Sequence, residues 1–188
     1  MVILISGGSG SGKSAYGERL MEELCGALQK YYIAAMEVVD EESGQRVERH
    51  RRQRAGKGFI TVERARDVQL AASGMEGQAA LLECVSNLTA NEMFGQKNPL
   101  SADYVVDKVC RDIGELADRL ELLCVVTNNV FEGGICYDAT TISYLEAMGR
   151  INERLAEMAD VVTEVVAGIP IPVKPARVCF TYTGGAQS

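Results

Sequence analysis

The sequence predicts an α/β fold: a three-layer α/β/α arrangement around a mostly parallel sheet. Short apolar runs alternate along the chain with longer amphipathic runs, which is typical of parallel strands joined by crossover helices. A glycine-rich turn directly follows the first apolar run. The 188 residues are enough for one domain with a full core. We therefore expect a single domain over residues 1–174 and a weakly structured tail over residues 175–188.

In the first half of the chain, β-branched and aromatic residues predict strands at 2–6, 31–35 and 59–62. A helix is expected over residues 13–29, because large apolar side chains recur there every four residues. They are Tyr16, Leu20, Leu24 and Leu28. Residues 39–56 are acidic at their start and basic at their end, an order that suits the dipole of a helix.

In the second half, buried strands are expected at 79–84, 122–127 and 161–167, the last ending at Gly168-Ile169-Pro170. A helix over 101–120 begins at Ser101, a plausible N-cap residue. Its expected apolar stripe is Tyr104, Val105, Val109, Ile113, Leu116 and Leu120. Another helix covers 141–158. Its expected stripe is Ile142, Leu145, Met148, Ile151, Leu155 and Met158.

The glycine-rich turn satisfies the phosphate-binding pattern G-x-x-x-x-G-K-[ST] of a P-loop. Its residues are Gly7, Gly8, Ser9, Gly10, Ser11, Gly12, Lys13 and Ser14. Glycines let successive backbone N–H groups converge on phosphate oxygens. Lys13 is expected to reach the β- and γ-phosphates, and the Ser14 hydroxyl to hold Mg²⁺. The motif lies between an expected strand and an expected helix, as the mechanism requires, so the fold is expected to be a P-loop NTPase of the RecA-like class.

His50 is the single histidine of the chain, and it lies in a basic segment with Arg46, Arg49, Arg51, Arg52 and Arg54. Two interpretations are open. The segment is a solvated helix whose arginines balance nearby glutamates. Alternatively, it holds phosphates that the P-loop does not cover, and His50 attacks phosphorus to form a covalent phosphoramidate.

The overall composition excludes several classes of protein. The net charge of −7 argues against general affinity for nucleic acid or anionic membranes, since such affinity depends on Lys and Arg. Six cysteines are scattered singly, without a CxxC pair, so neither a zinc site nor a disulfide framework is indicated. No apolar run approaches the length of a membrane span. We expect a cytoplasmic protein.

Several motifs together resemble the bifunctional adenosylcobinamide kinase/adenosylcobinamide-phosphate guanylyltransferase family of cobalamin biosynthesis. The resemblance runs from Met1 to about Lys174 and includes the P-loop and the segment around His50. The matching residues are His50-Arg51, Arg54, Phe59, Thr61, Glu63, Leu81-Leu82-Glu83, Thr127-Asn128, Gly149-Arg150-Ile151-Asn152 and Ala167-Gly168-Ile169-Pro170.

This resemblance implies two linked reactions. ATP or GTP phosphorylates the aminopropanol hydroxyl of adenosylcobinamide, and GTP then guanylylates that phosphate with release of pyrophosphate. His50 matches the family's covalent GMP carrier, with Arg51 and Arg54 beside the nucleotide phosphates. Glu63 and Glu83 match positions that contact the guanine nucleotide. A carboxylate can accept hydrogen bonds from guanine N1–H and the 2-amino group. The resemblance also implies a homo-oligomer, a trimer.

Alternatives stay open at both glutamates and for the whole protein. Glu83 can instead act as a Walker-B-like acid on Mg²⁺ or water at the end of a strand, and Glu63 can be a surface acid. The chain departs from the family pattern at Asn129, at 134–137 and around Leu145, in the region expected to face the corrinoid. A P-loop kinase with only one activity and a non-enzymatic nucleotide-dependent switch are the competing interpretations.

Overall fold

A seven-stranded sheet forms the centre of the computed structural model, which describes residues 1–37, 56–129 and 137–175. Across the sheet the strand order is β3-β2-β4-β5-β1-β6-β7. The strands are β1 (Val2–Ser6), β2 (Lys30–Ala34), β3 (Phe59–Glu63), β4 (Ala79–Glu83), β5 (Leu122–Val126), β6 (Val161–Val166) and β7 (Ile169–Lys174). All neighbouring pairs are parallel except β6–β7. This confirms the expected mostly parallel α/β sheet.

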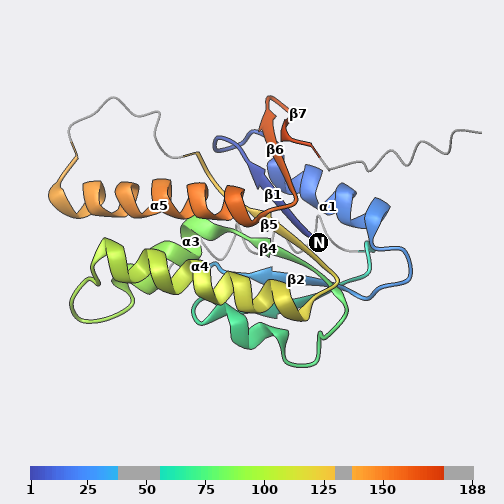
Figure 1. The fold of residues 1–188 in the computed structure, drawn as a ribbon, viewed down its shortest axis with the longest axis horizontal. Helices are drawn as coiled ribbons and strands as arrows, with labels where there is room; N and C mark the ends of the chain where they lie inside the picture. The colour runs from blue at the N-terminus through green and yellow to red at the C-terminus, as the bar shows by residue number, and fades with distance from the viewer. Residues whose placement is uncertain (38–55, 130–136, 176–188) are drawn as a thin grey trace, which may run out of the picture.

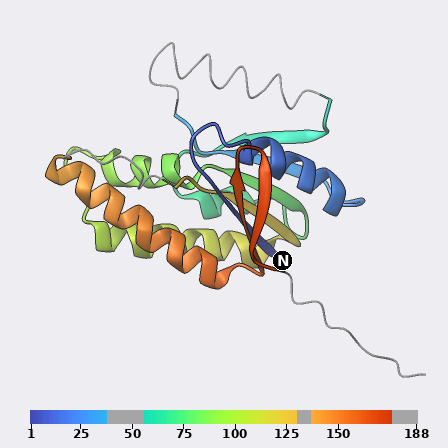
Figure 2. The same ribbon diagram turned by 90° about the horizontal axis from the view of Figure 1, so that it is seen from above.

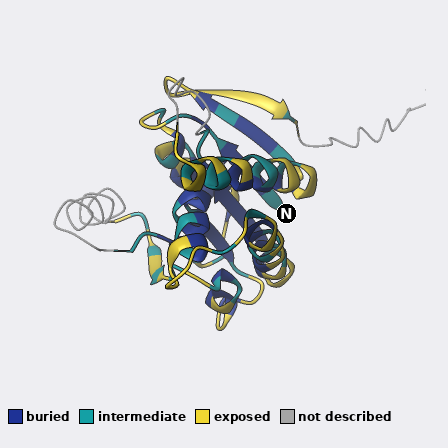
Figure 3. Ribbon diagram, turned by 90° about the vertical axis from the view of Figure 1, so that its left-hand side faces the viewer, coloured by how far each residue is buried: buried dark blue, intermediate teal, exposed yellow. Residues whose placement is uncertain are grey.

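Helices cover both faces of the sheet, which gives the three expected layers (Figures 1 and 2). One face carries α1 (Lys13–Leu24). The other carries α3 (Val85–Phe94), α4 (Ala102–Arg119), α5 (Ala139–Met158) and the short 3₁₀ helix η1 (Val68–Ala72). The core accordingly divides into two apolar clusters, one on each side of the strands. Figure 3 shows the buried strands between the helices and the exposed β7 at the edge.

The strand register places the ends of the parallel strands at one common edge. Ala34 of β2 lies opposite both Glu63 of β3 and Glu83 of β4. Val126 of β5 lies opposite Glu83 on one side and Ile5 of β1 on the other. In open α/β sheets, ligands bind in the crevice beyond these carboxyl ends.

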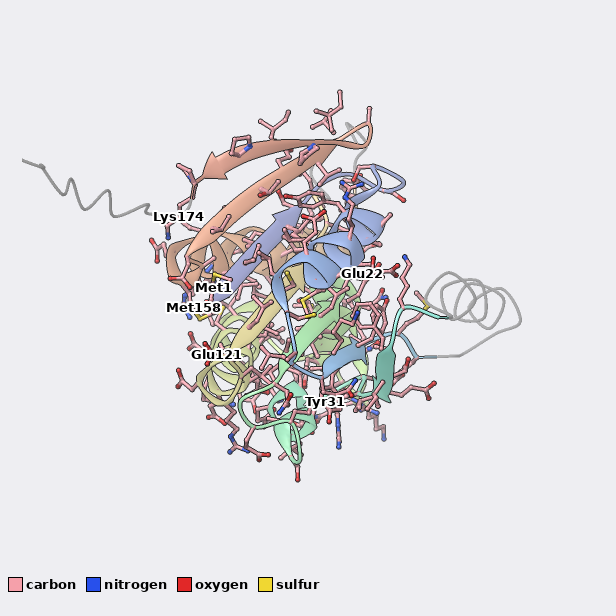
Figure 4. All side chains as sticks on the ribbon, turned by 90° about the vertical axis from the view of Figure 1, so that its right-hand side faces the viewer. Met1, Glu22, Tyr31, Glu121, Met158 and Lys174 are labelled. Atoms are coloured by element: carbon pink, nitrogen blue, oxygen red, sulfur yellow. The ribbon has the colours of Figure 1, made fainter. Side chains whose placement is uncertain are left out.

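At the opposite edge of the sheet, Met1 and Lys174 make hydrogen bonds to neighbouring segments, and Figure 4 labels Met1, Glu121 and Lys174 there. The ammonium group of Met1 donates to the carbonyl of Glu121 at 2.8 Å. Lys174 Nζ donates to the last carbonyls of α5, among them that of Glu157 at 3.1 Å. A cation at this end of a helix also interacts favourably with its dipole. None of the helices in the described part of the chain is sufficiently long and apolar to cross a membrane.

The first helix is shorter than predicted and buries a different face. Helix α1 ends at Leu24 instead of residue 29, because Gly26 adopts φ +53° and turns the chain toward β2. Leu24 is 46% exposed, whereas Gly17 and Met21 are buried. A Cβ at Gly17 would lie 3.2 Å from Ile5 Cδ1, so α1 contacts the sheet closely at this glycine. The prediction missed this contact because it considered only large apolar side chains.

Three other described elements were not predicted, and three positions in the predicted stripes of α4 and α5 were wrong. Helix α3, the 3₁₀ helix η1 and the antiparallel edge strand β7 were missed. Pro170 and Pro172 lie within β7, which an edge strand tolerates because its outer side needs no hydrogen-bond donor. Tyr104 and Ile142, both placed in the predicted apolar stripes, are each 54% exposed, and Met158 is 37% exposed.

The remaining predicted strands and helices are confirmed to within about two residues, the usual uncertainty of element boundaries. Ser101 caps α4 as expected, accepting a hydrogen bond from Tyr104 N at 3.4 Å. The charged segment expected to be helical lies outside the described residues, apart from Gly56. The tail beyond residue 175 also lies outside them.

Candidate active site at the carboxyl edge of the sheet

The P-loop connects the end of β1 to the start of α1 and is held by the turn between β6 and β7. The amide of Gly168 donates to the carbonyl of Ser11 at 2.8 Å. A Cβ at Gly7, which has φ +157°, would lie 2.5 Å from the carbonyl oxygen of Val165. Gly12 has φ +92° immediately before the helix begins. The loop therefore needs glycine at both positions, one for space and one for backbone conformation.

Lys13 folds back over this loop. Its side chain is buried, and Nζ donates to the carbonyl of Gly8 at 2.9 Å. Burial lowers the pKa of the Lys13 ammonium, while the neighbouring Cys84 and Glu83 raise it. A phosphate held in the loop would supply a negative charge beside this ammonium, and the N-terminus of α1 would add its positive end.

Glu83, at the end of β4, is joined to the P-loop through Ser14. The Ser14 hydroxyl donates to Glu83 Oε1, and the Tyr32 hydroxyl donates to Oε2 at 2.8 Å. This contact places Glu83 where a Walker-B-like acid lies, next to the hydroxyl expected to bind Mg²⁺. Hydroxyl and carboxylate oxygens are the ligands that Mg²⁺ prefers, so the two side chains fit that ion. Tyr32 is a site residue that sequence reasoning missed.

A polar network lies beside Glu83, at the end of β5. Thr127 Oγ1 donates to Asn152 Oδ1 of α5 at 2.6 Å, and Asn152 Nδ2 donates to the carbonyl of Asn128 at 3.3 Å. Asn128 Nδ2 donates to Ser86 Oγ at 2.6 Å. Thr127, Asn128 and Asn152 belong to the motifs quoted above, but no role had been assigned to them. The motifs Thr127-Asn128 and Gly149-Arg150-Ile151-Asn152 were the sequence signal that could have identified them as site residues.

Glu63 lines a pocket of about 580 Å³ at the ends of β2 and β3. Its walls come from the loop after β3 and from α3 and α4. They include Glu37, Arg64, Arg66, Glu92, Tyr104 and Lys108. Glu63 and Glu83 are level in the sheet, on either side of β2. Two interstrand spacings separate their backbones by about 10 Å, so the pocket and the P-loop are neighbouring parts of one edge.

One wall of this pocket is a cluster of charges centred on Lys108. Lys108 Nζ lies 2.7 Å from Asp67, 2.8 Å from Glu92 and 2.6 Å from Asp112. The hydrogen bond from Lys108 holds the pKa of Asp67 below its ordinary value, and the three carboxylates raise the pKa of Lys108 against the opposing effect of burial. The ammonium already occupies the space between the carboxylates. The cluster ties the loop after β3 to helices α3 and α4.

Three of the predicted site residues, His50, Arg51 and Arg54, lie outside the described residues. The described chain stops before this segment at Glu37 and resumes at Gly56. Both flanks carry ion pairs: Glu37 lies 3.4 Å from Arg66, and Lys57 lies 2.6 Å from the buried Glu18 of α1. Among the predicted site residues that the structure describes, Gly7–Ser14 and Glu83 lie together through the contact of Ser14 with Glu83. Glu63 lies at the same edge of the sheet.

Comparison with known proteins identifies relatives along nearly the whole chain. The family model described as cobinamide kinase/cobinamide phosphate guanyltransferase matches residues 3–173. The bifunctional adenosylcobalamin biosynthesis protein CobU of Salmonella typhimurium is 32% identical over 187 residues, which is 93% of this chain and 100% of the relative. CobU of Escherichia coli is 32% identical over 93% of this chain and 100% of its own length. CobP of Pseudomonas aeruginosa is 31% identical over 91% and 96%.

Solved structures support the fold independently. The flagellar accessory protein FlaH of Methanocaldococcus jannaschii aligns with a TM-score of 0.50 at 12% identity, covering 93% of this chain and 78% of that chain. A second structure, an ATPase domain, aligns with a TM-score of 0.51 at 15% identity, covering 87% and 68%. At these identities the likeness concerns the fold alone.

Proposed function

This chain belongs to the cobinamide kinase/cobinamide phosphate guanyltransferase family, and from that premise we propose that a single P-loop site serves both reactions. The enzyme acts in adenosylcobalamin biosynthesis, with cobinamide and nucleoside triphosphates as substrates. The observation that carries the proposal is the contact of Ser14 with Glu83 beside the buried Lys13. Together these side chains provide a cation for phosphate oxygens and an oxygen pair suited to Mg²⁺.

In the kinase reaction, the backbone amides of Gly7–Ser14 bind the donor triphosphate and Lys13 neutralises charge on its terminal phosphates. Ser14 and Glu83 would hold Mg²⁺, which, when bound, supplies further positive charge to the phosphates. The cobinamide hydroxyl attacks the γ-phosphorus, and the nucleoside diphosphate leaves. Catalysis depends on positioning and on charge stabilisation, which this edge of the sheet offers.

In the guanylyl transfer, neutral His50 attacks the α-phosphorus of GTP and pyrophosphate leaves from the P-loop. The phosphate of cobinamide phosphate then attacks the same phosphorus, and the bond to His50 breaks. A histidine with an ordinary pKa near 6.5 is largely neutral at cellular pH, so it needs no special activation. Arg51 and Arg54 stabilise the charge on the phosphates. The pairing of a kinase reaction with a guanylyl transfer follows from the family, and the covalent step on His50 is part of the proposal.

Replacing Lys13 with alanine tests the shared site. We expect phosphorylation of cobinamide to fall by about 10²–10³-fold, because a preorganised charge that stabilises the transition state is lost. Guanylyl transfer should fall in parallel, since both donors are triphosphates bound by the same loop. The exposed Lys97→Ala variant is the matched control. A Lys13→Ala enzyme that lost only the kinase activity would contradict the shared site.

We propose that the guanine base of GTP binds in the pocket that Glu63 lines and that Glu63 accepts its hydrogen bonds. Its carboxylate can accept hydrogen bonds from guanine N1–H and the 2-amino group, which adenine does not offer in that arrangement. A site built for such donors rejects bases that lack them. Glu83, joined to Ser14, is then assigned to the phosphates and Mg²⁺ instead of the base.

The Glu63→Gln variant is expected to raise the KM for GTP by about 10–100-fold, the loss typical of a hydrogen bond to a charged group. It should also reduce the preference for GTP over inosine triphosphate, which lacks the 2-amino group. Glu37→Gln, which changes another glutamate of the same pocket, is the control. If Glu63→Gln kept the parent's preference for GTP over inosine triphosphate, the guanine base would not bind in this pocket.

We further propose a homo-oligomer, a trimer as the family resemblance implies. The edge strand β7 offers apolar side chains for subunit contacts: Ile169 is 65% exposed and Val173 is 62% exposed. A cytoplasmic location is consistent with the four cysteines in the described ranges, all of which carry free thiols.

A further inference from the structure

Asn128 occupies a defined place between the P-loop and Glu83. Strand β5 lies between β4 and β1, with Val126 opposite Glu83 on one side and Ile5 on the other. The chain stays paired beyond the strand, since Thr127 N donates to Ile5 O at 2.9 Å and Asn129 N to Gly7 O at 3.1 Å. The residue between them, Asn128, is therefore fixed beside the first glycine of the P-loop.

The carboxamide of Asn128 is oriented by Ser86. Its Nδ2 donates to Ser86 Oγ at 2.6 Å, and that hydroxyl also lies 3.0 Å from Cys84 Sγ. Ser86 is itself held, because Tyr144 donates its hydroxyl hydrogen to the Ser86 carbonyl at 3.1 Å. Burial raises the pKa of Tyr144 to about 12, so this donor stays protonated. With Nδ2 engaged, the Oδ1 of Asn128 accepts no hydrogen bond from any residue that the structure describes.

We propose that Asn128 positions the acceptor hydroxyl in the kinase reaction by accepting its hydrogen bond at Oδ1. The inference rests on the proposed binding of the donor triphosphate in the P-loop. An attacking oxygen must lie about 3–3.5 Å from phosphorus with its lone pair aligned, and a hydrogen bond from the hydroxyl to a fixed oxygen aligns it. A neutral carboxamide does this beside a γ-phosphate without adding negative charge there.

The step balances with the substrates alone. The hydroxyl oxygen forms a bond to the γ-phosphorus, and the bond from that phosphorus to the β–γ bridging oxygen breaks. The bridging oxygen keeps the electron pair and leaves as part of the nucleoside diphosphate. The hydroxyl proton passes to an oxygen of the transferred phosphoryl group and then to water, as a late proton transfer in a loose transition state allows. Asn128 is unchanged at the end.

The test compares Asn128→Ala with Asn128→Asp. In Asn128→Ala we expect kcat for cobinamide phosphorylation to fall about 10²-fold, the cost of a misplaced reactant, with the nucleotide KM nearly unchanged. Asn128→Asp keeps an acceptor oxygen, and the Ser86 hydroxyl can donate to the carboxylate, but the added charge repels the γ-phosphate, so the nucleotide KM should rise in this variant alone. If Asn128 instead donated to the γ-phosphate, Asn128→Ala would also raise the nucleotide KM, and that result overturns the proposal.

A control and two further measurements separate a positioning role from a structural one. Asn98→Ala changes an exposed asparagine in the loop after α3 and should match the parent enzyme. Asn128→Ala should keep the parent's thermal midpoint and its labelling by α-labelled GTP. Loss of these together with the kinase activity overturns the proposal. A fully active Asn128→Ala beside an inactive Lys13→Ala also overturns it, whereas an active Lys13→Ala refutes the proposed P-loop function instead.

Discussion

The His50→Ala variant is expected to lose all covalent labelling by GTP that carries its label at the α-phosphate. The chain has no other histidine, so no second imidazole can carry GMP. Guanylyl transfer to cobinamide phosphate should fall by roughly 10⁴-fold or more, as when other catalytic nucleophiles are removed. Labelled protein is denatured and tested for the stability expected of a phosphoramidate: labile in acid and stable in base.

The position of the label and the kinase activity supply the controls. GTP labelled at the γ-phosphate should leave no label on the parent enzyme, because pyrophosphate departs with it. Phosphorylation of cobinamide should persist in His50→Ala, since the kinase reaction requires only the P-loop edge. Label that survived in His50→Ala would rule out this residue as the carrier. An unlabelled parent enzyme that binds GTP would favour a kinase with one activity.

Replacing Lys108 with methionine is expected to lower the free energy of unfolding by about 3–5 kcal/mol, the cost of removing one partner from a buried ion pair. Glu92 and Asp112 are 6% and 2% exposed, and Lys108 is 12% exposed. Without the ammonium, these two carboxylates and Asp67 face one another within 4.8 Å. Urea unfolding at neutral pH measures the loss, and Lys97→Met at an exposed position is the control. A change below about 1 kcal/mol would show that the cluster contributes as little as a surface pair.

The same variant should alter the response of stability to acid. In the parent, the pKa of Asp67 is lowered by its hydrogen bond from Lys108. This contribution is present above the ordinary carboxyl pKa and is lost as the pH falls through the lowered value. In Lys108→Met the carboxylates repel one another, so mild acid relieves the strain by protonating them. The stability difference between parent and variant should therefore narrow as the pH falls. Unfolding curves at a series of acidic pH values test this sign.

The sequence predicted where the P-loop lies in the fold because the motif is local. The glycines, Lys13 and Ser14 are consecutive, and a strand before them and a helix after them are visible in the hydrophobic pattern. The partner of Ser14 was less certain. Glu83 is distant in sequence, and only the register of β4 against β5 and β2 brings it to the loop. The contact with Ser14 that this register produces is the basis on which we propose a phosphate and Mg²⁺ role for Glu83.

The errors in the fold have physical causes of the same kind. Helix α1 was given a stripe that included Leu24, but its contact with the sheet is made through Gly17, which has no side chain to reveal it. Strand β7 was missed because prolines argue against a central strand and are tolerated only at an edge. The Lys108 cluster joins three separate segments of the chain, so no local pattern could predict it.

The link between Ser11 and Gly168 has a consequence for synthesis of the protein. The phosphate-binding loop is encoded at the start of the chain, but its support, the turn between β6 and β7, is encoded near the end. A chain emerging from the ribosome therefore carries the motif long before its loop is held in place. The loop can therefore be held in this way only after the turn between β6 and β7 has been synthesised, because the contact joins segments more than 150 residues apart.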